Sequence, residues 1–257
     1  NKGEILLYDE KNYVATISEV NLKIKKTNES SEAKLEGIFL NDKIFVNLSK
    51  EISNGQPETN LELRMQDINF FAKIIFSNSP KNIKNGKFLV KKDKNNISGI
   101  FDYNNNIITV LKSNIRNSFI DGKLSGKIAF LPFFDFDLDL NLNSLNFSKL
   151  RTAFLALEEK DKKNLFKINN KINGKLNISA NKIYSKSSLA NSFESRLKFN
   201  NGNVFIEQLL FNLGKLGAAD LLGSINNDKE FSNFKFEVNI YLDNQKKFLS
   251  KFNIYNK

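Results

Sequence analysis

The sequence predicts a mainly β protein, built as a long twisted antiparallel sheet with one short amphipathic helix. Three observations predict this class. Apolar and polar residues alternate strictly over residues 133–145, similar alternating stretches return elsewhere, and apolar residues follow clear helical spacing in one place. Because successive side chains of a strand point to opposite faces, such alternation gives a strand one apolar and one polar face. We therefore expect a sheet with one apolar and one polar side.

The stretch 133–145 is the clearest strand in the chain. Its alternating apolar side chains are Phe134, Phe136, Leu138, Leu140 and Leu142, and the polar residues between them are Asp135, Asp137, Asp139, Asn141 and Asn143. A helix would distribute the same residues around its whole circumference. The pattern therefore predicts a strand with five large apolar groups on one side.

Related stretches recur before and after this strand. The apolar positions of the later copy, 100 residues downstream, are Phe234, Phe236, Val238, Ile240 and Leu242, and those of a shorter, earlier echo are Leu61, Leu63 and Met65. A longer match relates residues 101–142 to residues 197–242, with Asn106 standing where Gly202 stands. Both residue types tolerate the left-handed conformation of a tight hairpin. The match predicts an internal repeat that lengthens the sheet.

The remaining elements follow from alternation bounded by polar turns. The predicted strands are residues 4–9, 13–25, 34–40, 43–48, 61–68, 70–76, 87–92, 97–103, 107–112, 115–120, 123–130 and, within 171–185, the stretch led by residues 174–178. Residues 53–60, with Gly55 and Pro57, are predicted to be a loop. For residues 70–76 a strand is preferred to a short helix because of their Ile-Ile-Phe content.

One helix is predicted at about residues 147–160. Phe147, Leu150, Phe154 and Leu157 recur at three- and four-residue spacing, which gives a helix one apolar face. We expect it to cover an end or an edge of the sheet.

Composition limits the chemistry. The 257 residues suffice for one undivided segment, and neither cysteine nor histidine occurs, so thiolate sites and the usual general base near neutral pH are missing. These absences favour a protein that is not an enzyme and has no cofactor. The 39 basic and 28 acidic residues give a net charge of +11, but the lysines are scattered between apolar residues, as on a solvated basic face. We therefore expect no nucleic-acid partner.

Two stretches resemble ion-binding and phosphate-binding motifs but lack the residues or the spacing that those motifs require. The carboxylates of residues 135–139 resemble the start of a calcium loop, yet Leu140 and Asn146 stand where that loop needs glycine and a bidentate glutamate. Residues 122–127 resemble a phosphate loop, with three residues between the glycines instead of four and Ile128 in place of Ser or Thr. We predict a solvated polar face and a hairpin, respectively, and no metal site.

The apolar face has two interpretations. Alternation is compatible with the closed core of a sandwich or barrel, and equally with a sheet curled into an open apolar groove for a greasy ligand. A single helix to cover a long sheet, and extension by repetition, favour the groove. A membrane barrel would need lipid-facing strands of about 9–11 residues and aromatic girdles, and the short strands predicted between residues 87 and 120 disfavour it.

Several of these stretches resemble the AsmA-like proteins of Gram-negative bacteria. The resemblance is carried by the glycine and alternating strand of residues 126–145 with the helix that opens at Phe147, by residues 174–178, by residues 197–204 and by residues 217–225. The resemblance is good over residues 84–242. Over the first 80 residues it is limited to the general pattern of the sequence.

The resemblance implies a repeating β-groove: a twisted antiparallel sheet bent into a trough with an apolar lining. It also implies a periplasmic protein that is tethered to the inner membrane and conducts phospholipids between the inner and outer membranes. Family members are anchored by an N-terminal helix that this sequence does not show, so we expect residues 1–257 to be a segment of a longer protein. The family supplies no catalytic residues.

We therefore predict a segment that shields acyl chains and conducts phospholipid; the alternative is a closed structural or adhesin-like β domain without a lipid path. The partners expected are phospholipid acyl chains and, through the full-length protein, membranes. The predicted groove-lining residues are Phe134, Phe136, Leu138, Leu140, Leu142, Phe234, Phe236, Val238, Ile240, Leu242, Leu61, Leu63 and Met65.

Overall fold

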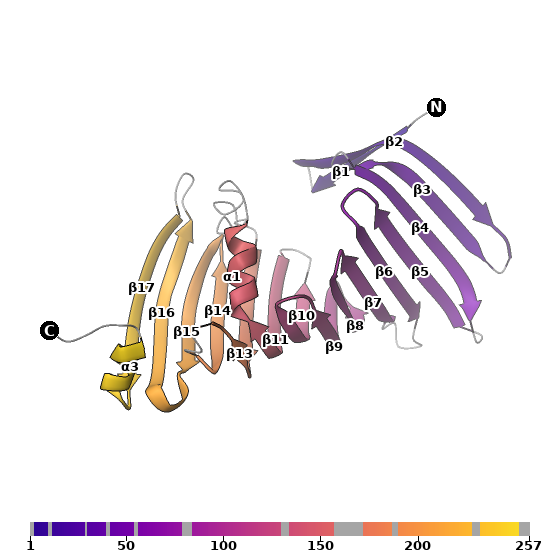
Figure 1. Ribbon diagram of the computed structural model, residues 1–257. Coiled ribbons are helices and arrows are strands. Elements are labelled where there is room, and N and C mark those ends of the chain that lie inside the picture. The colour runs from indigo at the N-terminus through magenta and orange to yellow at the C-terminus, as the bar shows by residue number, and fades with distance from the viewer. Residues whose placement is uncertain are drawn as a thin grey trace. The chain divides into compact units, whose positions relative to one another are not determined.

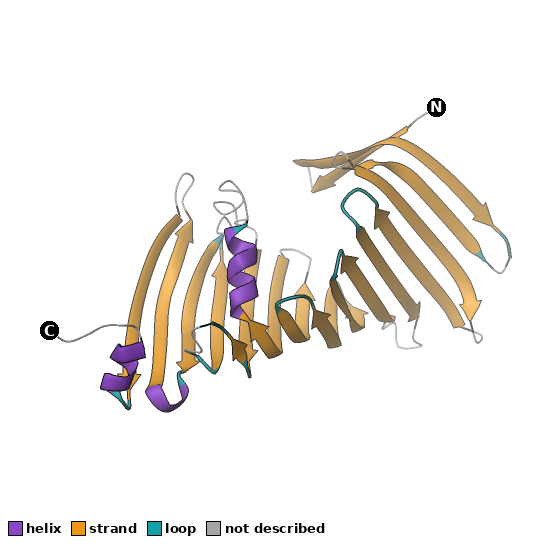
Figure 2. Cartoon of the chain, viewed as in Figure 1, coloured by secondary structure: helices purple, strands orange, loops and turns teal. Residues whose placement is uncertain are grey.

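The computed structural model describes residues 3–9, 12–28, 30–39, 42–53, 56–78, 84–129, 134–156, 172–186, 190–227 and 232–251. The predicted fold class is confirmed over these residues: the chain is mainly β, with 77% strand, one long mixed sheet of 17 strands that is not closed into a barrel, and two short helices (Figures 1 and 2). Its internal contacts group it into two compact units, residues 1–115 and 116–257. Each unit is described by itself.

Unit 1 is an antiparallel meander, in which every strand from β1 to β8 pairs with the next one along the chain. Its strands are β1 (Gly3–Asp9), β2 (Asn12–Lys26), β3 (Ser31–Phe39), β4 (Asp42–Ser53), β5 (Gln56–Met65), β6 (Phe70–Asn78), β7 (Lys84–Lys92), β8 (Asn95–Asn104) and β9 (Ile107–Arg116). The preference for a strand over a helix at residues 70–76 is confirmed by β6.

Two boundaries in this part differ from the sequence prediction. The predicted loop at residues 53–60 is wrong, because β4 extends to Ser53 and β5 begins at Gln56, with Pro57 opposite Ile52 near the start of β5, where a missing N–H is tolerated. The predicted strand at residues 115–120 is also wrong. Asn117 Oδ1 accepts hydrogen bonds from the backbone N–H groups of Phe119 (2.9 Å) and Ile120 (2.7 Å), so its side chain fixes a turn after β9.

Unit 2 contains the remaining strands and both helices. Its elements are β10 (Ile120–Ala129), β11 (Phe134–Asn146), α1 (Phe147–Leu155), β12 (Ile172–Ala180), β13 (Ile183–Tyr184), β14 (Ser192–Asn200), β15 (Asn203–Asn212), a 3₁₀ turn η1 (Gly214–Leu216), β16 (Gly217–Asn227), β17 (Ser232–Leu242) and α3 (Gln245–Lys251). Most pairings are antiparallel, as predicted. However, β11 runs parallel to β12 and β13, with Leu138 opposite Leu176, so the sheet is mixed. Parallel neighbours need a long crossover connection, and α1 lies in that connection.

Helix α1 begins where the sequence predicts and is described to Leu155; the rest of the predicted helix, from residue 157, lies outside the described residues. Asn146 caps it, because its Oδ1 accepts a hydrogen bond from the Lys149 N–H at 3.0 Å. Leu150 packs against the buried cluster of Leu142, Leu145 and Ala180 at the ends of β11 and β12. The helix thus covers the sheet at one end of these strands, and Figure 1 shows it in front of them, running in much the same direction as the strands.

The predicted equivalence of Asn106 and Gly202 is confirmed by the backbone. Asn105 and Asn106 have φ angles of 48° and 64°, and Asn201 and Gly202 have 49° and 80°. Two successive residues with positive φ make the tight turn that matches the twist of a β-hairpin. The turns between β8 and β9 and between β14 and β15 are therefore built alike.

Candidate functional site

The cross-strand register brings the predicted residues of β11 and β17 onto one face of unit 2. Directly paired residues on neighbouring strands project to the same side of a sheet. Starting at Leu138, the paired positions on β12, β14, β15, β16 and β17 are Leu176, Leu197, Ile206, Gly223 and Phe236. Leu138 and Phe236, 98 residues apart in the sequence, therefore belong to one apolar row across the sheet.

Three parallel rows extend this surface. The row of Phe136 continues through Gly174, Phe199, Val204, Ile225 and Phe234; that of Leu140 through Ile178, Ser195, Leu209, Leu221 and Val238; and that of Leu142 through Ala180, Phe193, Phe211, Ala219 and Ile240. We call these four rows the apolar face of unit 2. No member of the rows carries a charge, and Ser195 is their one polar side chain.

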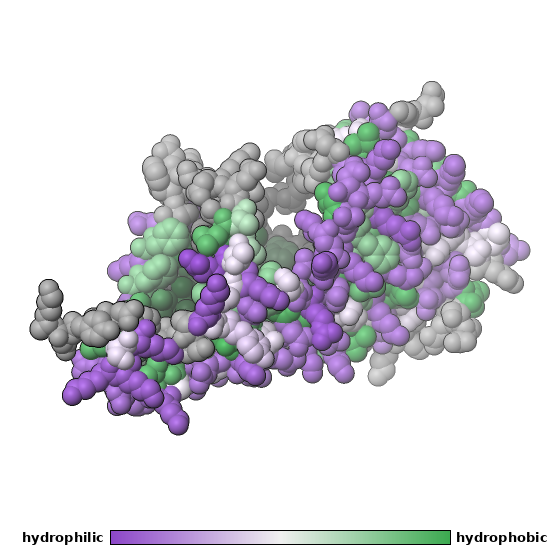
Figure 3. All heavy atoms as spheres, viewed as in Figure 1, coloured by the Kyte–Doolittle hydropathy of each residue, from purple (hydrophilic) through white to green (hydrophobic). Residues whose placement is uncertain are grey.

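The exposure of this face changes from one end to the other. Leu142, beside α1, is only 3% exposed, whereas Phe236 is 47%, Val238 55% and Ile240 51% exposed on β17. Figure 3 shows hydrophobic surface over β16 and β17 on the viewer's side. Large apolar side chains that stand side by side in water mark a surface suited to an apolar ligand or partner.

Two glycines leave room for the rings of the phenylalanines that are paired with them. Gly174 lies opposite Phe136, and a Cβ atom at Gly174 would lie 2.7 Å from Cγ of that ring; a Cβ atom at Gly223 would lie 2.5 Å from Cδ1 of Phe236. Each ring therefore lies across the backbone of the neighbouring strand. The Phe136 ring also meets the Phe199 ring, with centroids 5.3 Å apart. At these positions the surface consists of aromatic rings that lie over the neighbouring strands, next to the aliphatic side chains of the other rows.

Unit 1 has an apolar face of the same kind, and the three predicted residues of β5 lie on it. The row of Leu63 consists of Leu22, Leu35, Val46, Leu63, Ala72, Val90 and Ile97, and the row of Leu61 consists of Ile24, Ala33, Leu48, Leu61, Ile74, Phe88 and Gly99. We call these rows, with the neighbouring pair of Ile44 and Met65, the apolar face of unit 1. Its outer part is open, with Ile24 68% and Leu48 42% exposed, whereas Met65 is buried.

The register thus unites eight of the thirteen predicted residues in the four rows of unit 2 and places the three residues of β5 on the apolar face of unit 1. The other two, Phe134 and Leu242, continue the alternation of β11 and β17 beyond these rows. A role as groove lining stays a prediction for all of them. The intervening strands contribute residues that were not predicted from the sequence, especially Leu197, Leu209 and Leu221. Alternation was visible there in short segments, but pairing with β11 and β17 is not a property of any local stretch.

The opposite face of β11 and β17 is polar, as predicted. Asp135, Asp137 and Asp139 are exposed, and so are Lys235 and Glu237 on β17. The three aspartates stand at alternate positions along β11, and Asn177 Nδ2 on β12 donates to Asp139 Oδ1 at 2.8 Å. Within the described ranges, no three side chains of the types that bind metal ions lie close enough together to share one.

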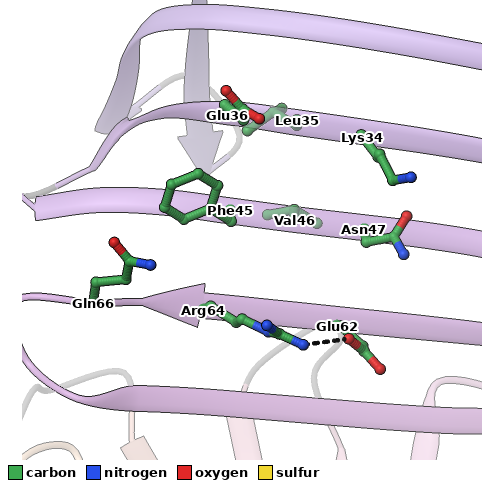
Figure 4. Close-up of a pocket in the computed structure, with 9 residues that line it drawn as sticks. All are labelled: Lys34, Leu35, Glu36, Phe45, Val46, Asn47, Glu62, Arg64 and Gln66. Carbon is green, nitrogen blue, oxygen red and sulfur yellow. Dashed lines mark hydrogen bonds and ion pairs between the residues drawn. The ribbon is translucent and has the colours of Figure 1, made fainter.

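A depression of about 320 Å³ on the polar face of unit 1 is lined in part by Glu62 and Arg64, which form an ion pair (Figure 4). Glu62 Oε1 accepts from Lys73 Nζ at 2.7 Å and its Oε2 from Arg64 at 3.2 Å, while the Arg64 guanidinium stands over the Phe71 ring at 5.4 Å. The hydrogen bond from Lys73, against a smaller opposing effect of burial, lowers the pKa of Glu62 below its ordinary value. Arg64 is paired with Glu62 and Lys34 with Glu32, so both cations of the lining are already engaged and the depression has little to offer an anionic ligand.

Comparison of the chain with protein-family models, curated protein sequences and solved structures gives no match. Across the described ranges, neither helix has the length and apolar character needed to cross a bilayer.

Proposed function

We propose that the apolar faces bind the acyl chains of phospholipids, and that the chain is a segment of an AsmA-like bridge that conducts phospholipid between the inner and outer membranes. The observation that carries this proposal is the uncharged face of unit 2, which runs over six strands, β11, β12 and β14 to β17, and is half-exposed at Phe236 and Val238. Open apolar surface of this extent costs free energy in water, and an acyl chain that covers it recovers that energy.

The energetics require no specific polar contact. Each methylene group removed from water contributes about 0.8 kcal/mol, so one or two acyl chains supply ample affinity through area alone. Because the four rows carry no charge, an acyl chain meets similar apolar contacts at each position along them. Such a surface therefore suits movement along the rows better than tight capture at one point.

The proposal is for a protein that is not an enzyme. Its location in the periplasm, its tether to the inner membrane through a part of the protein outside residues 1–257, and the membranes as partners all rest on the resemblance to the AsmA-like family.

A closed structural or adhesin-like domain is the competing proposal. It requires the alternating residues to form a dry core, and a dry core would leave little of Val238 or Ile240 accessible. Their exposed fractions, 55% and 51%, favour the open face.

Native mass spectrometry of the purified chain tests the proposal. After incubation with phospholipid in detergent micelles, we expect protein adducts whose added mass equals that of the lipid, and fluorescence of an environment-sensitive apolar dye that the lipid suppresses. A chain that stays free of lipid and fails to bind the dye would be a closed domain instead.

A further inference from the structure

We propose that Lys26 and Lys50, at the margin of the apolar face of unit 1, bind the phosphate of a phospholipid headgroup whose acyl chains lie on that face. This inference rests on the proposed function, and it specifies the headgroup phosphate as the part of the lipid that Lys26 and Lys50 recognise.

The two lysines lie in the row that follows the last apolar row of β2–β4. Lys26 is paired with Ser31, and Ser31 with Lys50. All three side chains therefore project from the apolar side of the sheet, with Ser31 between the two ammonium groups. Since neighbouring strands lie about 4.8 Å apart, the two lysine backbones are roughly 10 Å apart, and their long side chains can meet over one phosphate above Ser31.

A depression of about 340 Å³ lies at this place. Its lining residues are Lys26, Thr27, Asn28, Ser30, Ser31, Lys50, Glu51, Ile52 and Pro57. This volume falls at the lower end of the range for small-ligand sites, about 300–1,000 Å³. Glu51 contributes to the wall, but it lies between Lys50 and Ile52 on β4, so alternation directs its carboxylate to the polar face.

The charges in this depression are not neutralised by the protein. Both lysines are exposed, and neither forms an ion pair with another described residue. The Thr27 and Ser30 hydroxyl groups are occupied with each other, 2.9 Å apart, and this contact closes the turn beside Lys26. The Ser31 hydroxyl has no hydrogen-bond partner in the described part of the chain and can donate to an anion. Unlike the depression around Glu62, this one keeps its positive charge available.

Exposed apolar side chains adjoin the same lysines. Ile24, which is 68% exposed, lies two residues before Lys26. Leu48 and Ile52 lie two residues before and after Lys50, and they are 42% and 61% exposed. A cation and a hydroxyl group at the border of an open apolar surface match a molecule with a phosphate at one end and hydrocarbon at the other. A small soluble phosphate would leave the apolar side chains uncovered, so the complementarity favours a phospholipid.

The test compares two lipids with identical acyl chains, dioleoylphosphatidylglycerol and dioleoylglycerol, which lacks the phosphate. Both are offered in equal amounts in detergent micelles, and native mass spectrometry measures the ratio of bound lipids. We expect the unmodified chain to prefer the phospholipid about tenfold, as two partly exposed charge pairs together supply. The K26Q/K50Q variant should bind both lipids about equally, with its binding of dioleoylglycerol unchanged.

The control variant K23Q/K25Q removes the same charge from the polar side of β2, and it should keep the preference. Loss of the preference in this control, or its persistence in K26Q/K50Q, would overturn the headgroup site and leave acyl-chain binding intact. If the unmodified chain binds neither lipid, the proposed function itself fails. If glycerol 3-phosphate alone binds, in a manner that depends on Lys26 and Lys50, the site is one for a soluble phosphate compound and the lipid assignment is wrong.

Discussion

Val238 provides the sharpest test of the apolar face of unit 2, and the change is Val238→Asp. Because the Val238 side chain is 55% exposed, less than half of the contribution of a buried valine is at stake, and we expect the free energy of unfolding to fall by about 1 kcal/mol. In the empty protein the carboxylate stays hydrated. The fold should therefore survive, with an unchanged circular dichroism spectrum and a melting temperature only a few degrees lower.

Lipid binding should suffer far more than stability. An acyl chain that covers residue 238 displaces the water around the carboxylate, and the charged form then becomes costly. Protonating an aspartate of ordinary pKa, about 3.9, at pH 7 costs about 4 kcal/mol, which limits the loss of affinity to roughly a thousandfold. Covering the carboxyl group raises its pKa in the lipid complex. The loss of lipid affinity should therefore be complete at neutral pH. It should begin to shrink as the pH falls through the raised pKa of the complex, and it should disappear below about pH 4, where the carboxyl group is protonated in the free protein as well.

Two comparisons make this result decisive. Leu222→Asp on β16 introduces the same charge at a side chain of similar exposure, 42%, but on the opposite face, since Leu222 is paired with Glu237; it should bind lipid normally. Leu142→Asp, at a residue only 3% exposed, should unfold the protein. An unfolded Val238→Asp variant would refute the open face. A folded variant with normal lipid affinity at pH 7 would refute the assignment of this face to lipid.

Three further variants address the packing and charges that hold the sheet in place. Leu150→Ala removes the contact of α1 with the cluster at the ends of β11 and β12 and should lower the free energy of unfolding by about 2 kcal/mol, measured by urea denaturation. Gly174→Ala should cost about 2 kcal/mol or more, because the new Cβ meets the Phe136 ring and φ at this position is +145°. Glu62→Gln should cost about 0.5–1 kcal/mol at pH 7, because it removes the ion pair with Lys73. The pKa of Glu62 is lower in the folded state than its unfolded value of 4.5. The stabilisation by the ion pair is therefore fully present above pH 4.5 and is lost as the pH falls through the lowered pKa. Below that pKa, the variant and the unmodified chain should have the same stability.

Each of these variants has a matched control. Leu155→Ala changes an exposed residue of the same helix, and Gly3→Ala adds a Cβ whose nearest contact is 3.8 Å away, so both should leave stability within about 0.5 kcal/mol. Glu237→Gln removes an exposed carboxylate on β17 and should leave stability at pH 7 within about 0.5 kcal/mol. Equal effects in a variant and its control would show that the contact named for that variant does not stabilise the fold.

The local properties of this chain can be predicted from its residues alone. Alternation at Phe134–Leu142 predicted both the strand and the sorting of its side chains into an apolar and a polar face, because a strand has a period of two residues regardless of its neighbours. Asn106 and Gly202 predicted two hairpins of one kind, because positive φ depends on the residue itself. The start of α1 followed from the three- and four-residue spacing of the apolar residues from Phe147 onward, because a helix has a period of 3.6 residues.

Tertiary structure alone decided which strands share a face and how open that face is. The parallel pairing of β11 with β12, and the register that carries the row of Leu138 to Phe236, depend on contacts between distant segments that no short stretch encodes. Exposure is also nonlocal: Leu142 and Ile240 are both apolar members of one row, yet α1 buries the end of the row at Leu142 and leaves the end at Ile240 in water. The residues determine that a face is apolar, and what packs on that face determines whether it becomes a core or a binding surface.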